Sequence, residues 1–136
     1  MKIYVFGNGN ISFSDFKMYY EQIMIRYVGN ENVSFLVGDF RGVDTLTMEF
    51  LKCDSANVTV YHVGDKPRYL PDKFKTKVNN WIILGEFQND EERDLEAINQ
   101  CTHFIAMDFN SDKKRKSGTQ KNIEICEKLG KNRLLA

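Results

Sequence analysis

The most constraining feature of this sequence is a regular alternation between short β-branched or aromatic runs and longer stretches with helical periodicity. The short runs end at turn-forming residues, which is typical of buried strands. Between them, apolar residues recur every three or four positions, as on one face of a helix. This pattern predicts strands at 3–6, 33–37, 58–63 and 102–107, with helices at 12–29, 43–51, 90–100 and 119–129.

The strand-helix-strand order predicts parallel strands joined by right-handed crossovers, with helices on both faces of the sheet. We therefore expect an α/β fold: a single Rossmann-like three-layer domain spanning residues 1–136, with a parallel sheet of about five strands flanked by helices. Arg133 to Leu135 are expected to form a final edge strand. A chain of 136 residues that is 42% hydrophobic is long enough to bury one core.

The segment from Gly64 to Gln88 interrupts this regularity, because Pro67 and Pro71 break any helical or strand pattern. Long irregular segments in compact domains are often functional, so this one is interpreted as a lid or a short extra strand. Its apolar stretch Trp81 to Leu84 offers a surface through which two copies could form a homodimer.

The charge balance is neutral, with 19 Lys and Arg against 19 Asp and Glu. No long-range field therefore draws the whole molecule onto a polyanion. This argues against nucleic acid as a partner. The apolar run Ile3 to Phe6 is too short for a signal peptide or a membrane span, so we expect no membrane partner and a cytoplasmic location.

Cysteine and histidine residues show no metal-binding spacing. The cysteines are Cys53, Cys101 and Cys126, an odd number without a CxxC pair, which indicates neither a disulfide framework nor a zinc site. His62 and His103 lie in predicted strands and belong to no paired motif. We expect no metal and no cofactor.

Three glycine turns follow strands or begin helices, namely Gly7-Asn8-Gly9, Gly38 to Gly42, and Gly118-Thr119 after Ser117. In a parallel sheet such turns converge at the carboxyl edge, where ligands bind in open α/β sheets. Glycine permits close backbone approach, and free N–H groups at a helix start favour phosphate or carboxylate. The alternative is that each glycine only makes a tight connection.

Charged residues in these turns have two interpretations each. Asp44 either caps the second helix or accepts hydrogen bonds from a sugar hydroxyl or an amine. Arg41 either binds a phosphate or forms a surface ion pair. The basic run Lys113 to Lys116 is either a solvated charge cluster or an anion-binding loop above the helix that begins near Gly118.

Two stretches, VSFLVGDFRGVDTLTMEF and ERDLEAINQCTHFIAMDFN followed by SGTQKNIEICEKLGK, resemble the SLOG superfamily of Rossmann-like domains. That superfamily includes the cytokinin-activating phosphoribohydrolases and the DNA-processing protein A fold, and is close to the nucleoside 2-deoxyribosyltransferases. The resemblance runs from Met1 to Lys131. It implies a nucleotide-like ligand beside Gly7, the turn with Gly38, Gly42 and Asp44, the Arg93-Asp94 pair, and Ser117-Gly118-Thr119.

The resemblance departs from the enzymes at one position. Their Gly-Thr turn is followed, three residues after the Thr, by a catalytic glutamate, whereas this chain has Asn122 there and Glu124 on another helical face. An amide cannot act as a nucleophile or stabilise an oxocarbenium ion as a carboxylate does. A carboxylate from another wall would have to replace it, and the candidates are Asp44, Glu92, Asp94 and Asp108.

Three hypotheses remain from the sequence. The first is a sensor or carrier that binds a nucleotide, nucleoside or sugar-phosphate; the second is an N-glycosidase or 2-deoxyribosyltransferase with Asp44, Glu92 or Asp108 as catalytic residue; the third is a dimeric interaction module without a ligand. The residues expected to bind the small nucleotide-like ligand are Gly7, Asn8, Gly9, Gly38, Asp39, Arg41, Gly42, Asp44, Arg93, Ser117, Gly118 and Thr119.

Overall fold

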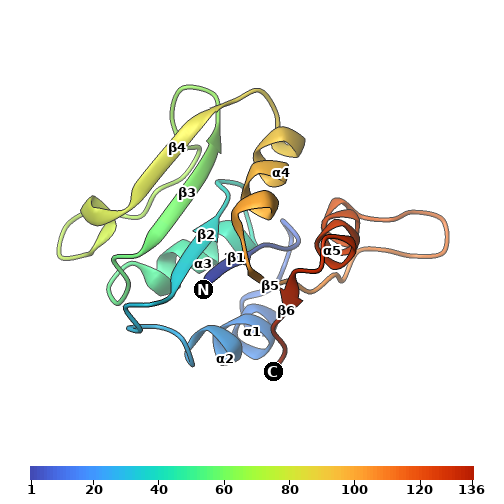
Figure 1. The fold of residues 1–136 in the computed structure, drawn as a ribbon, viewed down its shortest axis with the longest axis horizontal. Coiled ribbons are helices and arrows are strands. Elements are labelled where there is room, and N and C mark those ends of the chain that lie inside the picture. The colour runs from blue at the N-terminus through green and yellow to red at the C-terminus, as the bar shows by residue number, and fades with distance from the viewer.

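A computed structural model describes residues 1–136 and contains one six-stranded sheet in which all strands are parallel. The strands are β1 (Lys2–Val5), β2 (Ser34–Val37), β3 (Val58–Val63), β4 (Ile82–Phe87), β5 (His103–Ile105) and β6 (Asn132–Arg133), in the spatial order β4-β3-β2-β1-β5-β6 (Figure 1). The predicted α/β Rossmann-like class is confirmed.

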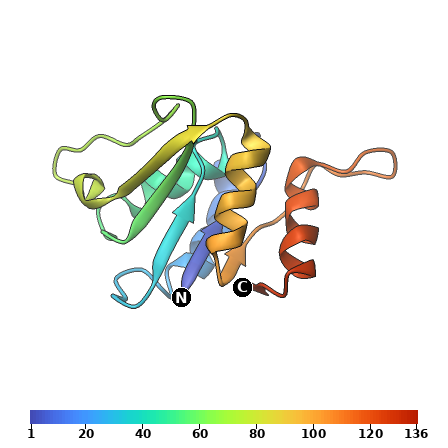
Figure 2. The ribbon, with the colours of Figure 1, turned by 45° about the horizontal axis from the view of Figure 1, so that its top comes forward.

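Helices cover both faces of the sheet (Figures 1 and 2). One face carries α1 (Phe13–Phe16), a π-helical turn (Lys17–Glu21), α2 (Gln22–Met24) and α3 (Val43–Leu51), while the other carries α4 (Asp90–Gln100) and α5 (Gly118–Lys128). The helix predicted over 12–29 is therefore shorter and contains a π-helical turn, which widens the helix between Lys17 and Glu21.

Strand β1 contributes to two separate hydrophobic cores because its side chains alternate between the faces. Ile3 and Val5 belong to the core beneath α1, α2 and α3. Tyr4 and Phe6 belong to the core beneath α4 and α5. This two-sided burial explains why the strand reads as a continuous apolar run rather than an alternating one.

The segment 64–88, which the sequence left as a lid or an extra strand, contains a 3-10 turn (Val78–Asn80) and the edge strand β4. The Trp81 side chain is buried and its indole N–H donates to the Ser55 carbonyl at 2.8 Å, which anchors the segment to the loop between α3 and β3. The sheet therefore has one strand beyond the five expected. The last strand begins one residue earlier than predicted and has only two residues.

Candidate functional site

The main polar cavity lies at the carboxyl edge of the sheet, next to the central strand β1. The order of strands reverses here, since β2, β3 and β4 extend to one side of β1 and β5 and β6 to the other. Ligands bind at this position in open α/β sheets. The cavity has a volume of about 380 Å³ and is lined by the turns after β1 and β2, by α4, by the loop after β5 and by the start of α5.

Two of the predicted glycine turns interlock at the rim of this cavity. Gly42 has φ +79°, and a Cβ atom placed there would lie 2.5 Å from the Asn8 carbonyl oxygen and 2.6 Å from Gly9. The Val43 amide donates to the same Asn8 carbonyl at 3.3 Å. The turn after β2 can therefore rest on the turn after β1 only because residue 42 has no side chain.

Gly38 leaves space for two charged side chains. A Cβ atom at this position would lie 2.6 Å from Asp44 Oδ2 and 3.1 Å from Arg93 Cζ. The strand end at Gly38 thus lets the Asp44 carboxyl group and the Arg93 guanidinium pack against the backbone. The first carries a potential negative charge and the second a permanent positive charge into a buried region.

Asp44 is the buried carboxyl group of the cavity. It lies in the first turn of α3 and is 6% exposed, and its Oδ2 accepts a hydrogen bond from the Phe40 amide at 3.0 Å. Burial raises the pKa of Asp44 to about 7, although the charge of Arg93 acts in the opposite direction. Asp44 therefore holds the turn that precedes its helix, without capping the helix itself, and presents a carboxyl group that can exchange a proton near neutral pH.

Arg93 is a buried cation held by three carboxylates. Its guanidinium donates to Asp39 Oδ1 at 2.8 Å and to Asp94 Oδ1 at 2.8 and 3.0 Å, and its Nη1 lies 3.0 Å from Asp90 Oδ1. Burial would lower the pKa of Arg93, but Asp94 and Asp44 raise it above its usual value, so the side chain stays charged. The predicted ligand-binding residue Arg93 lines the cavity with most of its donors already in use.

Asp39 faces away from the cavity lining. Its carboxylate accepts hydrogen bonds from the backbone and side chain of Arg68 at 2.8 to 3.1 Å, in addition to the bond from Arg93. These bonds lower the pKa of Asp39 despite its burial. Asp39 therefore ties the segment after β3 to α4 and holds Arg93 in place, and it does not contact the cavity directly.

Asp94 and Asn122 join α4 to α5 across the floor of the cavity. Asp94 Oδ2 accepts a hydrogen bond from the Asn122 side-chain amide at 3.0 Å, and its Oδ1 accepts one from the Tyr4 hydroxyl at 3.2 Å. Asn122, at the position where the resemblance drawn from the sequence led us to look for a glutamate, thus lines the cavity and donates to a carboxylate. Both oxygens of Asp94 already have protein partners.

Asp108 links the turn after β1 to the loop before α5. Its Oδ1 accepts hydrogen bonds from the Asn8 side chain at 3.0 Å and the Ser117 hydroxyl at 2.7 Å. Hydrogen bonds from Ser111, Ser117 and Asn8 lower the pKa of Asp108, although burial acts in the opposite direction. Asp108 is not among the residues that line the cavity, so its geometry fits an anchor better than an acid or base.

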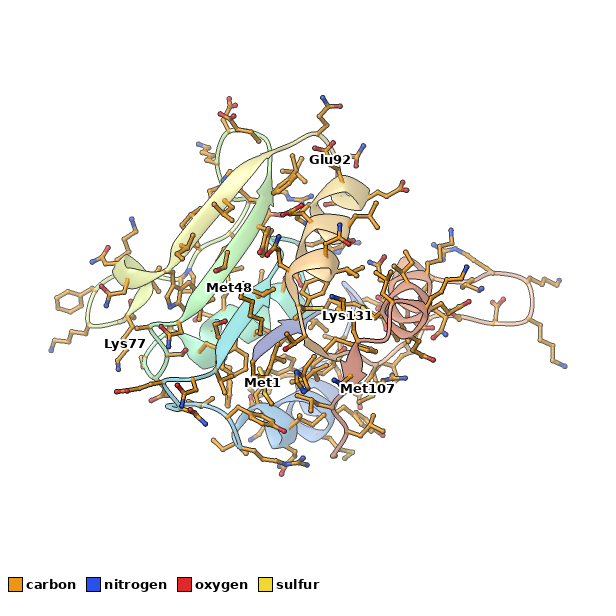
Figure 3. All side chains as sticks on the ribbon, viewed as in Figure 1. Met1, Met48, Lys77, Glu92, Met107 and Lys131 are labelled. Carbon is orange, nitrogen blue, oxygen red and sulfur yellow. The ribbon has the colours of Figure 1, made fainter.

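Glu92 also lies outside the cavity. Its side chain is exposed in the first turn of α4, and Figure 3 shows it at the outer end of that helix. Of the four carboxylates that could replace the missing glutamate, Asp44 and Asp94 therefore line the cavity, and Glu92 and Asp108 do not.

The start of α5 lines the cavity with Ser117, Gly118 and Thr119. The Ser117 hydroxyl accepts a hydrogen bond from the Gln120 amide at 3.0 Å, and the amides of Gly118 and Thr119 in the first turn have no partner within the helix. Arg41 and Arg115 line the same cavity, and the Arg41 guanidinium stacks on the Phe40 ring at 5.0 Å. Free helix amides and two arginines together favour a phosphate or carboxylate group.

Most of the predicted ligand-binding residues come together in this cavity, whereas Gly38, Asp39 and Gly42 support it from behind. Tyr4 and Phe6 are core residues, as the sequence predicted, and they also line the cavity. Arg115 lies in the basic run that was interpreted either as a solvated charge cluster or as an anion-binding loop, and it too lines the cavity. The cavity lining also includes residues that the sequence did not suggest as ligand contacts: Asn10, Phe40, Asp90, Asn110 and Asn122. Phe40 lies inside a predicted turn, which is the only signal that could have identified it.

The structure contains no cluster of three or more His, Cys, Asp or Glu side chains arranged to hold a metal ion. None of its helices combines the length and apolar character needed to cross a membrane.

No protein-family model matches this chain, and no curated protein matches its sequence. Its fold is similar to a solved structure of DNA processing protein A from Helicobacter pylori, which was described for its single-stranded DNA binding mode. The TM-score is 0.68 at 15% sequence identity, and the match covers 98% of this chain but 63% of that chain. This likeness supports the Rossmann-like α/β fold, and membership of the SLOG superfamily stays a prediction.

The same comparison contradicts our expectation that the charge balance argues against a nucleic-acid partner. DNA processing protein A has this fold and binds single-stranded DNA. The error lies in the physical argument, because net charge governs long-range attraction whereas contacts to phosphates depend on local groups. A neutral chain can still present a basic loop.

Proposed function

We propose that this chain binds a nucleotide in the cavity at the carboxyl edge of its sheet. The observation that carries the proposal is the presence of two chemistries in the lining of one cavity of about 380 Å³: the start of α5 with Arg41 and Arg115, and the carboxyl groups of Asp44 and Asp94. A phosphate suits the helix amides and the arginines, and sugar hydroxyls or base amines suit the carboxyl groups. The volume lies in the range usual for small-molecule sites.

In this arrangement the phosphate accepts hydrogen bonds from the amides of Gly118 and Thr119 and pairs with Arg115. The turn at Gly7 to Gly9 lines the same cavity and lets the ligand approach the backbone closely. The Asp44 carboxyl group contacts the sugar or the base. Asn122 and Asp94 remain bonded to each other and set the depth of the cavity floor.

The test is calorimetric titration with nucleosides and with their 5′-mono- and diphosphates. Arg115→Ala is expected to weaken binding of the phosphorylated ligands at least about tenfold, because a charge-assisted bond is lost. Lys113→Ala is the matched control, since Lys113 belongs to the same loop but does not line the cavity. Equal effects of the two substitutions, or equal affinity for nucleosides and nucleotides, would contradict the proposal.

A second candidate function is binding of single-stranded DNA, favoured by the loop between β5 and α5. This loop projects away from the body of the molecule in both views (Figures 1 and 2) and carries exposed Lys113 and Lys114 beside the cavity residue Arg115. At its base, Phe109 is 47% exposed and packs against Tyr19 with ring centroids 5.4 Å apart. Basic side chains with an exposed aromatic ring suit a single strand.

The two candidates are separated by fluorescence anisotropy with a labelled oligo-dT. If DNA binds, its affinity falls with salt and falls further in the Lys113→Ala/Lys114→Ala double variant, because phosphate contacts release counterions. The same variant leaves mononucleotide affinity unchanged if only the cavity is used. An oligonucleotide that shows no binding at low salt would exclude the second candidate.

A further inference from the structure

Strand β4 is an open edge of the sheet with an apolar surface. Ile82, Ile83 and Leu84 are 58%, 37% and 43% exposed, although they form half of a strand that pairs with β3 on only one side. Edge strands of this kind present unpaired N–H and C=O groups that invite a further strand. Monomeric proteins usually protect such an edge with lysine, proline or a bulge.

The opposite edge of the same sheet is protected in this way. Strand β6 has only two residues, and one of them is the exposed Arg133. In β4 the only irregularity comes late, where the register with β3 shifts and Glu86 has φ +67°. The flat part of β4 is therefore the apolar triplet itself, with no charge to prevent pairing.

The sheet face next to the triplet is also uncovered. A groove of about 490 Å³ lies between α4 and β4, and its floor includes Leu36, Tyr61, Ile82 and Leu84. Helix α4 packs over part of β3 and leaves this strip open. Pairing at β4 would continue the apolar floor into a neighbouring strand.

Charge is distributed with opposite signs at the two ends of β4. Exposed Lys73, Lys75 and Lys77 precede the strand, and exposed Glu86, Glu91 and Glu92 occur within or after its end. Figure 3 shows Lys77 and Glu92 at opposite ends of β4. An antiparallel copy of the same strand would place each lysine end beside an acidic end, whereas a parallel copy would oppose like charges.

We propose that this face binds a second copy of the chain, with β4 paired antiparallel to β4 of the partner about a two-fold axis at Ile83. In this register Ile82 lies opposite Leu84 of the partner, so the apolar triplet is complementary to itself. Such an isologous interface closes after two subunits. A second copy fits this face because its own lysine end would lie beside the acidic end of the first copy, and its acidic end beside the lysine end.

The first experiment measures mass by sedimentation velocity over a range of concentrations. The unmodified chain is expected to be a dimer and Ile83→Lys a monomer, because the substitution places two like charges on the axis. Ile25→Lys is the control, since Ile25 is 62% exposed on α2's end, far from β4 in the chain, and it should stay dimeric. Circular dichroism melting checks that all three proteins are folded.

The second experiment locates the interface. Ile83→Cys in a Cys53→Ser background is expected to cross-link with a short bis-maleimide, because the other cysteines, Cys101 and Cys126, are buried. Lys77→Glu and Glu91→Lys should each weaken the dimer several-fold, and the double variant should recover its affinity. A monomeric unmodified chain, a dimeric Ile83→Lys variant, or no cross-link at residue 83 would each overturn the proposal.

Discussion

Asp94 accepts a hydrogen bond from the side-chain amide of Asn122 at 3.0 Å, which connects α4 to α5 beneath the cavity. Because Asp94 also accepts a hydrogen bond from Arg93, the pair links a buried cation on α4 to the first turns of α5. The side-chain amide of Asn122 is thus a hydrogen-bond donor that suits the carboxylate of Asp94.

Asn122→Asp is expected to destabilise the protein by about 1 to 3 kcal/mol, because it removes a donor and places a second carboxylate next to Asp94. Urea denaturation at neutral pH measures the effect. Asn122→Ala, which removes the donor without adding charge, should cost less. If the two variants are equally stable, repulsion with Asp94 is not significant.

Asp44 should make stability depend on pH. Its pKa is about 7 in the folded state against 3.8 as the ordinary value, so between these values the folded protein holds a proton that the unfolded chain has lost. The free energy of unfolding therefore falls as pH rises from about 4 to about 7, by at most about 4 kcal/mol, and stays low above that range. Asp44→Asn should remove this decrease.

The measurement is the free energy of unfolding of both proteins at several pH values within that window. Groups with lowered pKa values, such as Asp39 and Asp108, contribute a slope of opposite sign below the window. The difference in free energy of unfolding between the unmodified chain and Asp44→Asn at each pH gives the contribution of Asp44 alone. A difference that does not change with pH would show that Asp44 is ionised throughout.

Asp39 and Asp90 provide a matched pair, since each carboxylate contacts both Arg68 and Arg93. The Asp39 side chain is 0% exposed and that of Asp90 is 52% exposed. Asp39→Asn is expected to lower the free energy of unfolding by about 3 kcal/mol or more, because the buried Arg93 guanidinium loses a negatively charged partner. Asp90→Asn should cost less than about 1 kcal/mol.

Thermal denaturation of these two variants, measured side by side, decides the point. If the two variants lose the same stability, solvent screening does not distinguish the ion pairs of Asp39 from those of Asp90. A large loss for Asp39→Asn alone would also show that the segment after β3 is held to α4 by this contact, because Arg68 belongs to that segment.

Gly42→Ala tests the interlocked turns. Both Gly42 and Gly29 have positive φ, at +79° and +84°, but only at Gly42 would a Cβ atom meet other atoms. Gly42→Ala should therefore be about 1 to 3 kcal/mol more destabilising than Gly29→Ala, which reports the backbone conformation alone. Chemical denaturation measures both, and similar values would show that the two turns separate easily.

The order of strands and helices was predictable because each central strand is buried on both faces and reads as a short apolar run. Strand β4 was harder to assign: Ile82, Ile83 and Leu84 look like any apolar patch, and Gly85, although it lies within the strand, ends the apolar run in the sequence. Because β4 lies at the edge of the sheet, it lacks the burial on both faces that marks the central strands. Tertiary pairing with β3 decides its structure.

The location of the site followed from the topology, but the direction of individual side chains did not. Asp39 faces Arg68, which comes from the segment without a clear pattern, so its ion pairs had no local signal. Arg115 belongs to a basic run, and only the path of the loop brings it to the cavity while Lys113 stays outside. Proposed roles in binding therefore remain predictions for Asp44, Arg41 and the glycine turns.

The position of β1 between β2 and β5 makes the cavity depend on segments that are far apart along the chain. Its lining combines the turn after β1 with Ser117 to Asn122. During synthesis β1 can pair with β2, and β2 with β3, before β5 and α5 have been made. The walls of the cavity can therefore come together only after α5 has been synthesised, and a chain truncated before α5 would lack them.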